Sequence, residues 1–332
     1  MIIPPRYRLT KNIVSLLNQL EKLKTTLDLL PINKKSELYH RKKSILKSAL
    51  YSARIEGNPL TEADINSRNA QPRDKLESSN LFRAIEFILR PSWKKPLATD
   101  DLKRLHRLVL NGLSDSAGFL RQEPSAIFNS AGVAVYICPS PAEIKTLLQK
   151  LLSYINRKTL DPVPIKVLLS HLVFEKIHPF LDGNGRVGRL LIHLVLKKWQ
   201  WNLRGQASFE QYLDRYRQEY YDLLSANGTD ATEFVEFFLK SLLWSIRQAI
   251  KVKKTIAPVK LSKEQNLPPR RSEILNIIRD HSQVSLDFIH RRFAAVSPRL
   301  LRYDLKKLQD ANLIKKLGVT RGAVYISGKI NR

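Results

Sequence analysis

The residues best suited to chemistry lie in one run of twelve, HPFLDGNGRVGR, which begins at His178. Gly183 and Gly185 let the backbone approach an anion, and the apolar helix predicted after them offers unpaired N–H groups in its first turn. Arg186 and Arg189 share one face of that helix and can clamp successive phosphates. His178 is the group in the run that can accept a proton near neutral pH. We therefore expect phosphate-transfer chemistry at this loop.

The same run contains a carboxylate, Asp182, between the histidine and the glycines. Mg²⁺ prefers one or two carboxylates together with phosphate oxygens, so Asp182 is the expected ligand of a magnesium cofactor. The alternative is a surface turn with solvated arginines. Such a turn would not need His, Asp, Asn and two Arg within twelve residues.

This run resembles the motif of the Fic family, His-x-Phe-x-Asp/Glu-Gly-Asn-Gly-Arg-x-x-Arg, and matches it at every specified position. The resemblance implies an adenylyltransferase that moves AMP from ATP to a Ser, Thr or Tyr hydroxyl of a target protein or of itself. His178 is then the base, Arg186 faces the β-phosphate and Arg189 the γ-phosphate. The implied nucleotide-binding residues of the motif are Gly183, Asn184, Gly185, Arg186, Gly188 and Arg189.

A second segment, from Tyr51 to Asn58, resembles the inhibitory motif of the same family, Ser/Thr-x-x-x-Glu-Gly/Asn. The resemblance implies that Glu56 pairs with Arg189 and fills the room that the γ-phosphate needs, while Ser52 holds the end of the helix. A carboxylate can replace a phosphate oxygen on a guanidinium. The alternative is that Glu56 is an exposed charge ahead of a glycine helix cap.

A β-hairpin is predicted over 125–139, where β-branched and aromatic residues flank Asn129 to Gly132. By resemblance it is the flap that aligns the target hydroxyl through strand addition, with Ala126, Ile127 and Phe128 on its first strand. Many relatives have a glycine pair where Phe128 and Asn129 stand here. That difference puts the flap contacts in doubt.

Tyr220, Tyr221 and Asn227 resemble the segment of the family that packs on the adenosine and hydrogen-bonds it. The alternative is an ordinary amphipathic helix with aromatic core positions. We expect His171 to be a buried structural histidine, and Phe180 to pack the loop against the core.

Composition and charge narrow the class of protein. The 332 residues carry a net charge of +27, one cysteine and no apolar run as long as a membrane span. Met1 to Arg6 contains no apolar signal segment, and a single cysteine suits a reducing compartment, so we expect a cytoplasmic protein without membrane contact. Residues 251–332 hold 19 Lys and Arg against six Asp and Glu, which indicates a polyanionic partner or a solvated basic surface.

Apolar periodicity predicts a mainly α-helical chain. The resemblance implies that its core is a Fic-type helical core with one small β-hairpin flap. Proline and serine caps mark several helix starts. The expected helices lie at about 10–30 and 35–56, after Thr61, from Ser79 or Asn80, from Thr99, from Ser140 to about 156, from Pro164 to His178, and at about 208–226 and 230–251.

The end of the chain resembles a winged helix-turn-helix domain: helices at about 270–281, 285–293 and from Ser297, then strands at 313–316 and 323–326. A basic third helix and wing favour DNA over a protein partner as its ligand. The expected DNA contacts are Arg299, Arg302, Lys306 and Arg321. The expected domains are an N-terminal helical region at 1–75, the catalytic core at 76–252, a linker at 253–269 and the winged helix at 270–332.

Two other functions stay open from the sequence. The chain is either a related enzyme that removes AMP from a modified protein, with Glu56 orienting water, or a DNA-binding regulator whose Fic domain only senses nucleotide. A homodimer is a further possibility. The identity of the target protein is not encoded in any motif of the sequence.

Overall fold

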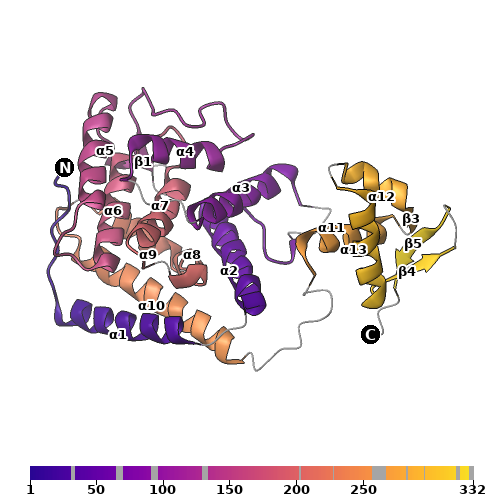
Figure 1. The fold of residues 1–332 in the computed structure, drawn as a ribbon. Coiled ribbons are helices and arrows are strands. Elements are labelled where there is room, and N and C mark those ends of the chain that lie inside the picture. The colour runs from indigo at the N-terminus through magenta and orange to yellow at the C-terminus, as the bar shows by residue number, and fades with distance from the viewer. Residues whose placement is uncertain are drawn as a thin grey trace. The chain divides into compact units, whose positions relative to one another are not determined.

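The chain folds into two compact units, residues 1–255 and 256–332, each with its own hydrophobic core (Figure 1). The computed structural model describes residues 1–30, 34–64, 70–90, 96–128, 134–201, 203–226, 228–255, 267–281, 283–294, 296–318 and 322–328.

The first unit is mainly helical and carries one two-stranded hairpin. No helix in the described part of the chain is long and apolar enough to cross a membrane. The elements of this unit are α1 (Lys11–Leu29), α2 (Lys34–Ile55), α3 (Pro72–Ile88), α4 (Thr99–Val109), β1 (Ala126–Phe128), β2 (Ala134–Ile137), α5 (Pro141–Asn156), α6 (Val163–Ile177), α7 (Asn184–Lys198), the 3₁₀ turn η2 (Leu203–Gly205), α8 (Glu210–Arg215), α9 (Arg217–Ser225) and α10 (Thr232–Thr255).

Helices α6 and α7 pack against each other in the core of this unit. Nearly every residue of α6 is buried, because apolar residues occur all around the helix and the polar Ser170, His171 and Glu175 are buried among them. Pro164 lies in its first turn, where the missing N–H would have no partner in any case. The short loop between α6 and α7 is therefore anchored at both ends by buried helices.

Two groups of helices pack around this core. Helices α1 and α10, far apart in the sequence, lie side by side (Figure 1, indigo and orange). Arg6 joins the same region, since its N–H donates to the Thr229 carbonyl and its own carbonyl accepts from Ala231. Helix α2 packs against α3 and α8. The end of α2 is thereby fixed against the part of the core that contains α7.

Helix boundaries differ from the prediction at two places. Helix α3 begins at Pro72, so Ser79 and Asn80 lie inside it, and the Asn80 amide instead donates to the Val109 and Asn111 carbonyls at the end of α4. The Asp64 carboxylate accepts from the Thr61 N–H, and the rest of the short helix predicted after Thr61 lies outside the described residues. The helix predicted over 208–226 is broken at Tyr216 into α8 and α9. A proline in the first turn was the stronger start signal for α3 than a mid-helix serine.

The described residues of the second unit form three helices and a three-stranded antiparallel sheet of order β3-β5-β4. The strand β3 was not predicted, because three residues are too few to display an alternating pattern. Its elements are α11 (Pro269–Asp280), β3 (Gln283–Ser285), α12 (Leu286–Arg292), α13 (Pro298–Asp310), β4 (Ile314–Leu317) and β5 (Val324–Ser327).

Candidate active site

The loop that contains the predicted motif is closed by its own asparagine. The Asn184 amide donates to the Phe180 carbonyl at 2.8 Å, and its oxygen accepts from the Phe180 N–H at 2.9 Å. Gly183 precedes α7 in the left-handed region, with φ 76°, which favours glycine. Asn184 therefore shapes the loop in this structure, whereas the sequence led us to expect it on the anion.

His178 lies where α6 ends, also in the left-handed region, with φ 49°. Its Nδ1 is 3.3 Å from the Glu175 carbonyl oxygen, which can only accept a hydrogen bond. Nδ1 must therefore carry the proton in the neutral ring, and Nε2 keeps its lone pair. Burial lowers the pKa of His178, so the ring is neutral near pH 7. These properties suit a general base.

Arg121, which sequence reasoning missed, joins the loop to the hairpin. It is 5% exposed, and its Nε donates to the His178 carbonyl at 2.7 Å. Its other nitrogens donate to the carbonyls of Glu123 and Pro139, at the two ends of the hairpin. One buried guanidinium thus fixes the backbone of His178 relative to β1 and β2. A single arginine between a helix and a hairpin carries no sequence signal of this role.

His106 on α4 is a second residue that the sequence did not identify. Its ring stacks on Phe180 with 3.8 Å between centroids, which confirms that Phe180 packs the loop inward. The Gly118 N–H donates to Nδ1 at 2.8 Å, so Nε2 carries the proton and donates to the Asp182 carbonyl at 2.9 Å. Burial lowers the pKa of His106, which keeps this neutral tautomer in place.

The first motif arginine, Arg186, is held by two carboxylates. Its Nη1 donates to Glu77 Oε1 at 2.5 Å and its Nη2 to Asp182 Oδ1 at 2.9 Å. Asp182 is 62% exposed, and its Oδ1 also accepts from the Gly183 N–H. A single exposed carboxylate beside an anion loop fits a Mg²⁺ ion shared with phosphate oxygens. No group of three or more potential ligands gathers among the described residues, so the protein alone offers no closed metal site.

The second motif arginine, Arg189, is 1% exposed and binds the end of α2. Its Nε donates to the Ser52 hydroxyl and its Nη2 to the Ser52 carbonyl, both at 2.9 Å. Nη2 also donates to Glu56 Oε1 at 2.8 Å. Burial by itself would lower the pKa of Arg189, but the Glu56 carboxylate and two nearby tyrosines raise it, so the guanidinium stays charged. The predicted pairing of Glu56 with Arg189 is present in the geometry.

The glycine cap of α2 and the Glu56 ion pair occur together. Gly57 has φ 99°, and the Asn58 N–H donates back to the Ala53 carbonyl, which ends the helix. The Glu56 carboxylate lies so close to Gly185 that a Cβ on this glycine would be 2.5 Å from Oε1. Glu56 therefore sits against the glycine loop, where an incoming anion would have to lie.

Each motif arginine also keeps one buried nitrogen without an acceptor among the described residues. These atoms are Nε of Arg186 and Nη1 of Arg189. A buried guanidinium N–H without a partner is costly, and an anionic ligand would satisfy it. The orphaned donors thus support an anion site on this face of α7.

Behind Arg189 lies a buried cluster of titratable groups. His171 is fully buried as expected, and burial lowers its pKa to about 3, while Tyr220 lies 3.0 Å from its Nε2. Burial raises the pKa of Glu175 to about 8. Gly188 fits here because a Cβ would collide with the Glu175 carboxylate. The structure thus gives Gly188 a packing reason that the sequence motif does not state.

The predicted adenosine residues lie in different environments. Tyr220 is completely buried, whereas the Tyr221 hydroxyl donates to the Ile55 carbonyl at 3.1 Å and so ties α9 to the end of α2. Asn227 lies outside the described residues. In this conformation neither tyrosine presents a free hydroxyl to a ligand.

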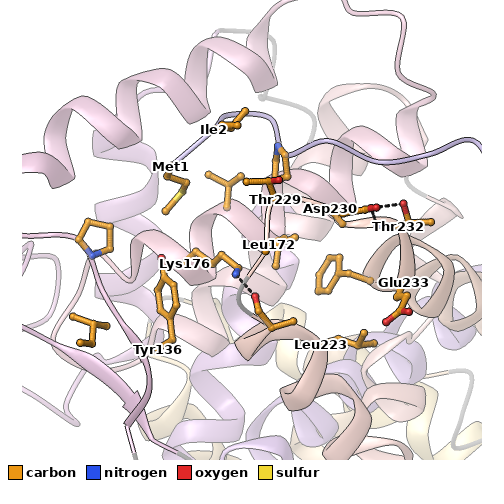
Figure 2. Close-up of a pocket in the computed structure, with 18 of the residues that line it drawn as sticks. Met1, Ile2, Tyr136, Leu172, Lys176, Leu223, Thr229, Asp230, Thr232 and Glu233 are labelled. Carbon is orange, nitrogen blue, oxygen red and sulfur yellow. Dashed lines mark hydrogen bonds between the residues drawn. The ribbon is translucent and has the colours of Figure 1, made fainter.

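The predicted hairpin is present as β1 and β2, paired antiparallel with a bulge between Ile127 and Phe128. Ala126 pairs with Ile137 and Phe128 with Ala134. Beside β2 lies a cavity of about 660 Å³, lined by the hairpin, α6, the end of α9 and the start of α10 (Figure 2). Lys176 lines this cavity. Its ammonium donates to the Ala226 carbonyl at 2.7 Å and lies over the Tyr136 ring. None of the motif residues, His178 to Arg189, lines this cavity.

In the second unit, Arg299, Arg302 and Lys306 are all exposed on α13. The buried Asp304 lies between them in sequence but faces inward, where it accepts from Arg270 and Arg271. The predicted wing residue Arg321 lies outside the described residues. Three of the four predicted DNA contacts are therefore available to a partner.

Comparison with known proteins identifies the first unit. Residues 96–196 match the Fic/DOC family. The protein adenylyltransferase Fic of Drosophila sechellia is 28% identical over 214 residues, which cover 59% of this chain and 40% of that protein. The chain thus spans about two fifths of the length of the curated relatives that it matches.

Solved structures agree on the fold. A Fic family protein from Desulfovibrio desulfuricans has a TM-score of 0.67 and 23% identity, with 99% of both chains covered. Fic-1 from C. elegans has a TM-score of 0.60 and 24% identity, with 74% of each chain covered. Residues 96–196 therefore match the family that the sequence motif indicated, and the structure shares the mainly helical fold with a small hairpin that solved Fic proteins have.

Proposed function

We propose that this chain is a protein adenylyltransferase that transfers AMP from ATP to a Ser, Thr or Tyr hydroxyl of another protein or of itself. The observation that carries the proposal is the geometry of the motif loop. It combines a neutral histidine whose Nε2 is unprotonated with a glycine-led helix N-terminus and two buried arginines. The adenylyltransferase relatives supply the reaction class.

The proposed step is an in-line displacement. Nε2 of His178 takes the proton of the target hydroxyl while its oxygen attacks the α-phosphorus of ATP. The bond from the α-phosphorus to the bridging oxygen breaks, and pyrophosphate leaves. Arg186 meets the β-phosphate, and Arg189 meets the γ-phosphate after Glu56 has withdrawn. Such catalysis depends on positioning and on charges that are in place before the reaction.

Asp182 is the residue that would hold Mg²⁺, which when bound neutralises part of the phosphate charge.

Within the chain itself, the hairpin is the element that would align the target hydroxyl. We propose that Ala126, Ile127 and Phe128 pair with an extended segment of the target protein, as a third strand beside β1. Arg121 then keeps the hairpin and His178 in register, because it bonds the His178 carbonyl and the Glu123 and Pro139 carbonyls that flank the hairpin.

We propose that Glu56 inhibits this reaction. Its carboxylate takes Arg189 Nη2 and lies against Gly185, so a γ-phosphate would have to displace it. ATP that binds beside Glu56 would hold its α-phosphorus out of line with the attacking oxygen. Such misalignment lowers the rate by orders of magnitude without preventing binding.

The same ion pair favours a second candidate, removal of AMP from a modified protein. In that reaction Glu56, 30% exposed beside the loop, would orient the attacking water.

We propose separately that the second unit is a winged helix that binds DNA through Arg299, Arg302 and Lys306, because these exposed cations share α13. A nucleotide-sensing regulator would combine that unit with a Fic domain that transfers nothing.

One experiment decides between these functions. The purified chain is incubated with α-labelled ATP and Mg²⁺, and its intact mass is measured. An adduct of one AMP with release of pyrophosphate supports transfer, whereas hydrolytic loss of AMP from an AMP-modified protein supports the removal reaction. Absence of both from the parent and from the Glu56→Gly variant would overturn the proposal in favour of a sensor.

A further inference from the structure

The two carboxylates on Arg186 differ in how firmly they are held. Asp182 comes from the same loop and is 62% exposed. The side chain of Glu77 comes from α3, is only 15% exposed, and bonds Nη1 at 2.5 Å. Solvent screens an exposed ion pair far more than a buried one. The buried contact with Glu77 therefore fixes the guanidinium, and Asp182 is the partner that can turn toward a ligand.

Glu77 is itself fixed by a residue from the end of α2. The Asn58 amide donates to Glu77 Oε2 at 2.7 Å and to the Asp74 carbonyl at 3.1 Å, and its oxygen accepts from the Leu60 N–H. Asn58 is 7% exposed. Both oxygens of the Glu77 carboxylate therefore have partners, one on α7 and one in the turn after α2.

We propose that Glu77 is a positioning residue that holds Arg186 toward the β-phosphate, and that Asn58 sets Glu77 for this role. This rests on the proposed function, in which Arg186 meets that phosphate. Glu77 occupies only Nη1, so Nη2 becomes available when Asp182 turns away. Nε has no acceptor among the described residues. Two donors of the guanidinium then face an anion while the third keeps its orientation.

Asn58 also links this contact to the inhibitory one, because it lies two residues after Glu56. The turn that carries Glu56 to Arg189 thus carries Asn58 to Glu77. One segment, from Ser52 to Leu60, thus sets the acidic partners of both motif arginines. Withdrawal of Glu56 from Arg189 has to preserve the Asn58 contact if Arg186 is to remain in place.

The test compares ADP with AMP, because only ADP has a β-phosphate. Binding of each nucleotide to the full-length chain is measured by calorimetry for the parent, Glu77→Gln and Asn58→Ala. The matched control is Glu86→Gln, which removes another carboxylate from α3. Glu77→Gln should weaken ADP by about tenfold, the smaller end of what one charge-assisted hydrogen bond is worth, and leave AMP unchanged. Asn58→Ala should also weaken the binding of ADP, by a smaller factor, and Glu86→Gln should leave the affinity for both nucleotides unchanged.

Two results would overturn the proposal. Equal weakening of ADP and AMP by Glu77→Gln means that the residue only supports the fold, and thermal unfolding of each variant reports that loss directly. Tighter binding of ADP means that Glu77 neutralises Arg186 instead of orienting it. Asn58→Ala, which leaves all charges in place, keeps the comparison available if Glu77→Gln does not fold.

Transfer assays separate this inference from the proposed function. In a Glu56→Gly background, Glu77→Gln should raise the KM for ATP and leave the pH profile of His178 unmoved. If Glu56→Gly itself transfers no AMP, the proposed function fails while the ADP and AMP affinities still decide the role of Glu77. If it transfers AMP and the nucleotide selectivity is unchanged by Glu77→Gln, only the inference fails.

Discussion

At the scale of single residues, the proposed reaction depends on which nitrogen of His178 carries a proton. The Glu175 carbonyl accepts from Nδ1, and burial lowers the pKa of the ring. The same helix turn thus sets both the tautomer and the charge of the base. A base with a lowered pKa stays unprotonated further into the acid range than a free histidine does.

His178→Ala should abolish AMP transfer and leave ATP affinity nearly unchanged, because the anion contacts lie on Arg186, Arg189 and the loop backbone. Transfer is measured with α-labelled ATP and affinity by calorimetry. In the parent, kcat/KM should decline only below the ordinary histidine pKa of 6.5, since protonation removes the base. Equal labelling by variant and parent, or an acid limb above pH 6.5, would contradict this role.

Glu175 offers a test of the buried cluster. Its carboxyl keeps its proton up to about pH 8 in the fold, whereas an ordinary glutamate releases it near 4.5. The folded state therefore binds more protons between these values, and its stability falls as pH rises through them. Each unit of pKa displacement corresponds to about 1.4 kcal/mol.

Glu175→Gln should remove this dependence. Urea unfolding of parent and variant, measured from pH 5 to 8, should show the parent losing stability relative to the variant as pH rises. The lowered pKa of His171 acts in the opposite direction, with stability lost as pH falls from 6.5 toward 3, and is common to both proteins. Parallel stability curves would show that Glu175 is ionised in the fold.

At the scale of elements, the inhibition proposed here is a property of how α2 ends. The helix stops at Ile55, Gly57 reverses the chain, and Ser52 and Glu56 together take two of the three nitrogens of Arg189. Tyr221 on α9 bonds the Ile55 carbonyl and so fastens the same end from another side. The end of α2 is thus held in place from two sides, and the proposed inhibition depends on the Glu56 side chain that this end places on Arg189.

Glu56→Gly should raise self-labelling and target labelling by about tenfold or more, because the γ-phosphate can then align the α-phosphorus. Glu56→Gly combined with Arg189→Ala should not, since the freed arginine is what orients the phosphate. Glu62→Gly, which removes an exposed partner of Lys47, is the matched control and should leave labelling unchanged. A single variant no more active than the parent across ATP and Mg²⁺ concentrations would rule out the regulatory helix.

At the scale of the whole molecule, the chain joins a Fic domain to a second unit with its own core. That unit contributes strongly to the net charge of +27, and its cations Arg299, Arg302 and Lys306 are exposed on one helix. Binding to a duplex would release counterions from each phosphate that a cation neutralises. Such binding would recruit the proposed enzyme to DNA.

Affinity of the full chain for duplex DNA should therefore fall steeply with salt concentration. Arg299→Ala and Arg302→Ala should each weaken binding and reduce the slope of log K against log salt by about 1. Arg83→Ala, at an exposed arginine of α3, is the control. The measurement is fluorescence anisotropy of labelled duplexes over a salt series, and absence of binding at low salt would assign the basic charge to another partner.

The sequence by itself determined the features that depend on local order. The capping box at Ser140 predicted α5, and the structure has Glu143 accepting from the Ser140 N–H at 3.0 Å. Glycine and asparagine at fixed spacing likewise predicted where the chain turns at the motif loop, at the hairpin and at the end of α2. The Glu56 pairing was reached through family resemblance rather than through any local signal.

Only the tertiary structure decided which side chains hold that loop. Glu77 lies 109 positions before Arg186, and Arg121 lies 57 before His178, so neither pairing has a sequence periodicity. His106 carried no sequence signal of its role, because its ring stacks on Phe180 only where α4 packs against the loop. Such contacts form only where particular faces of distant helices meet. The burial of many residues together decides which faces meet, so no single residue predicts the contact.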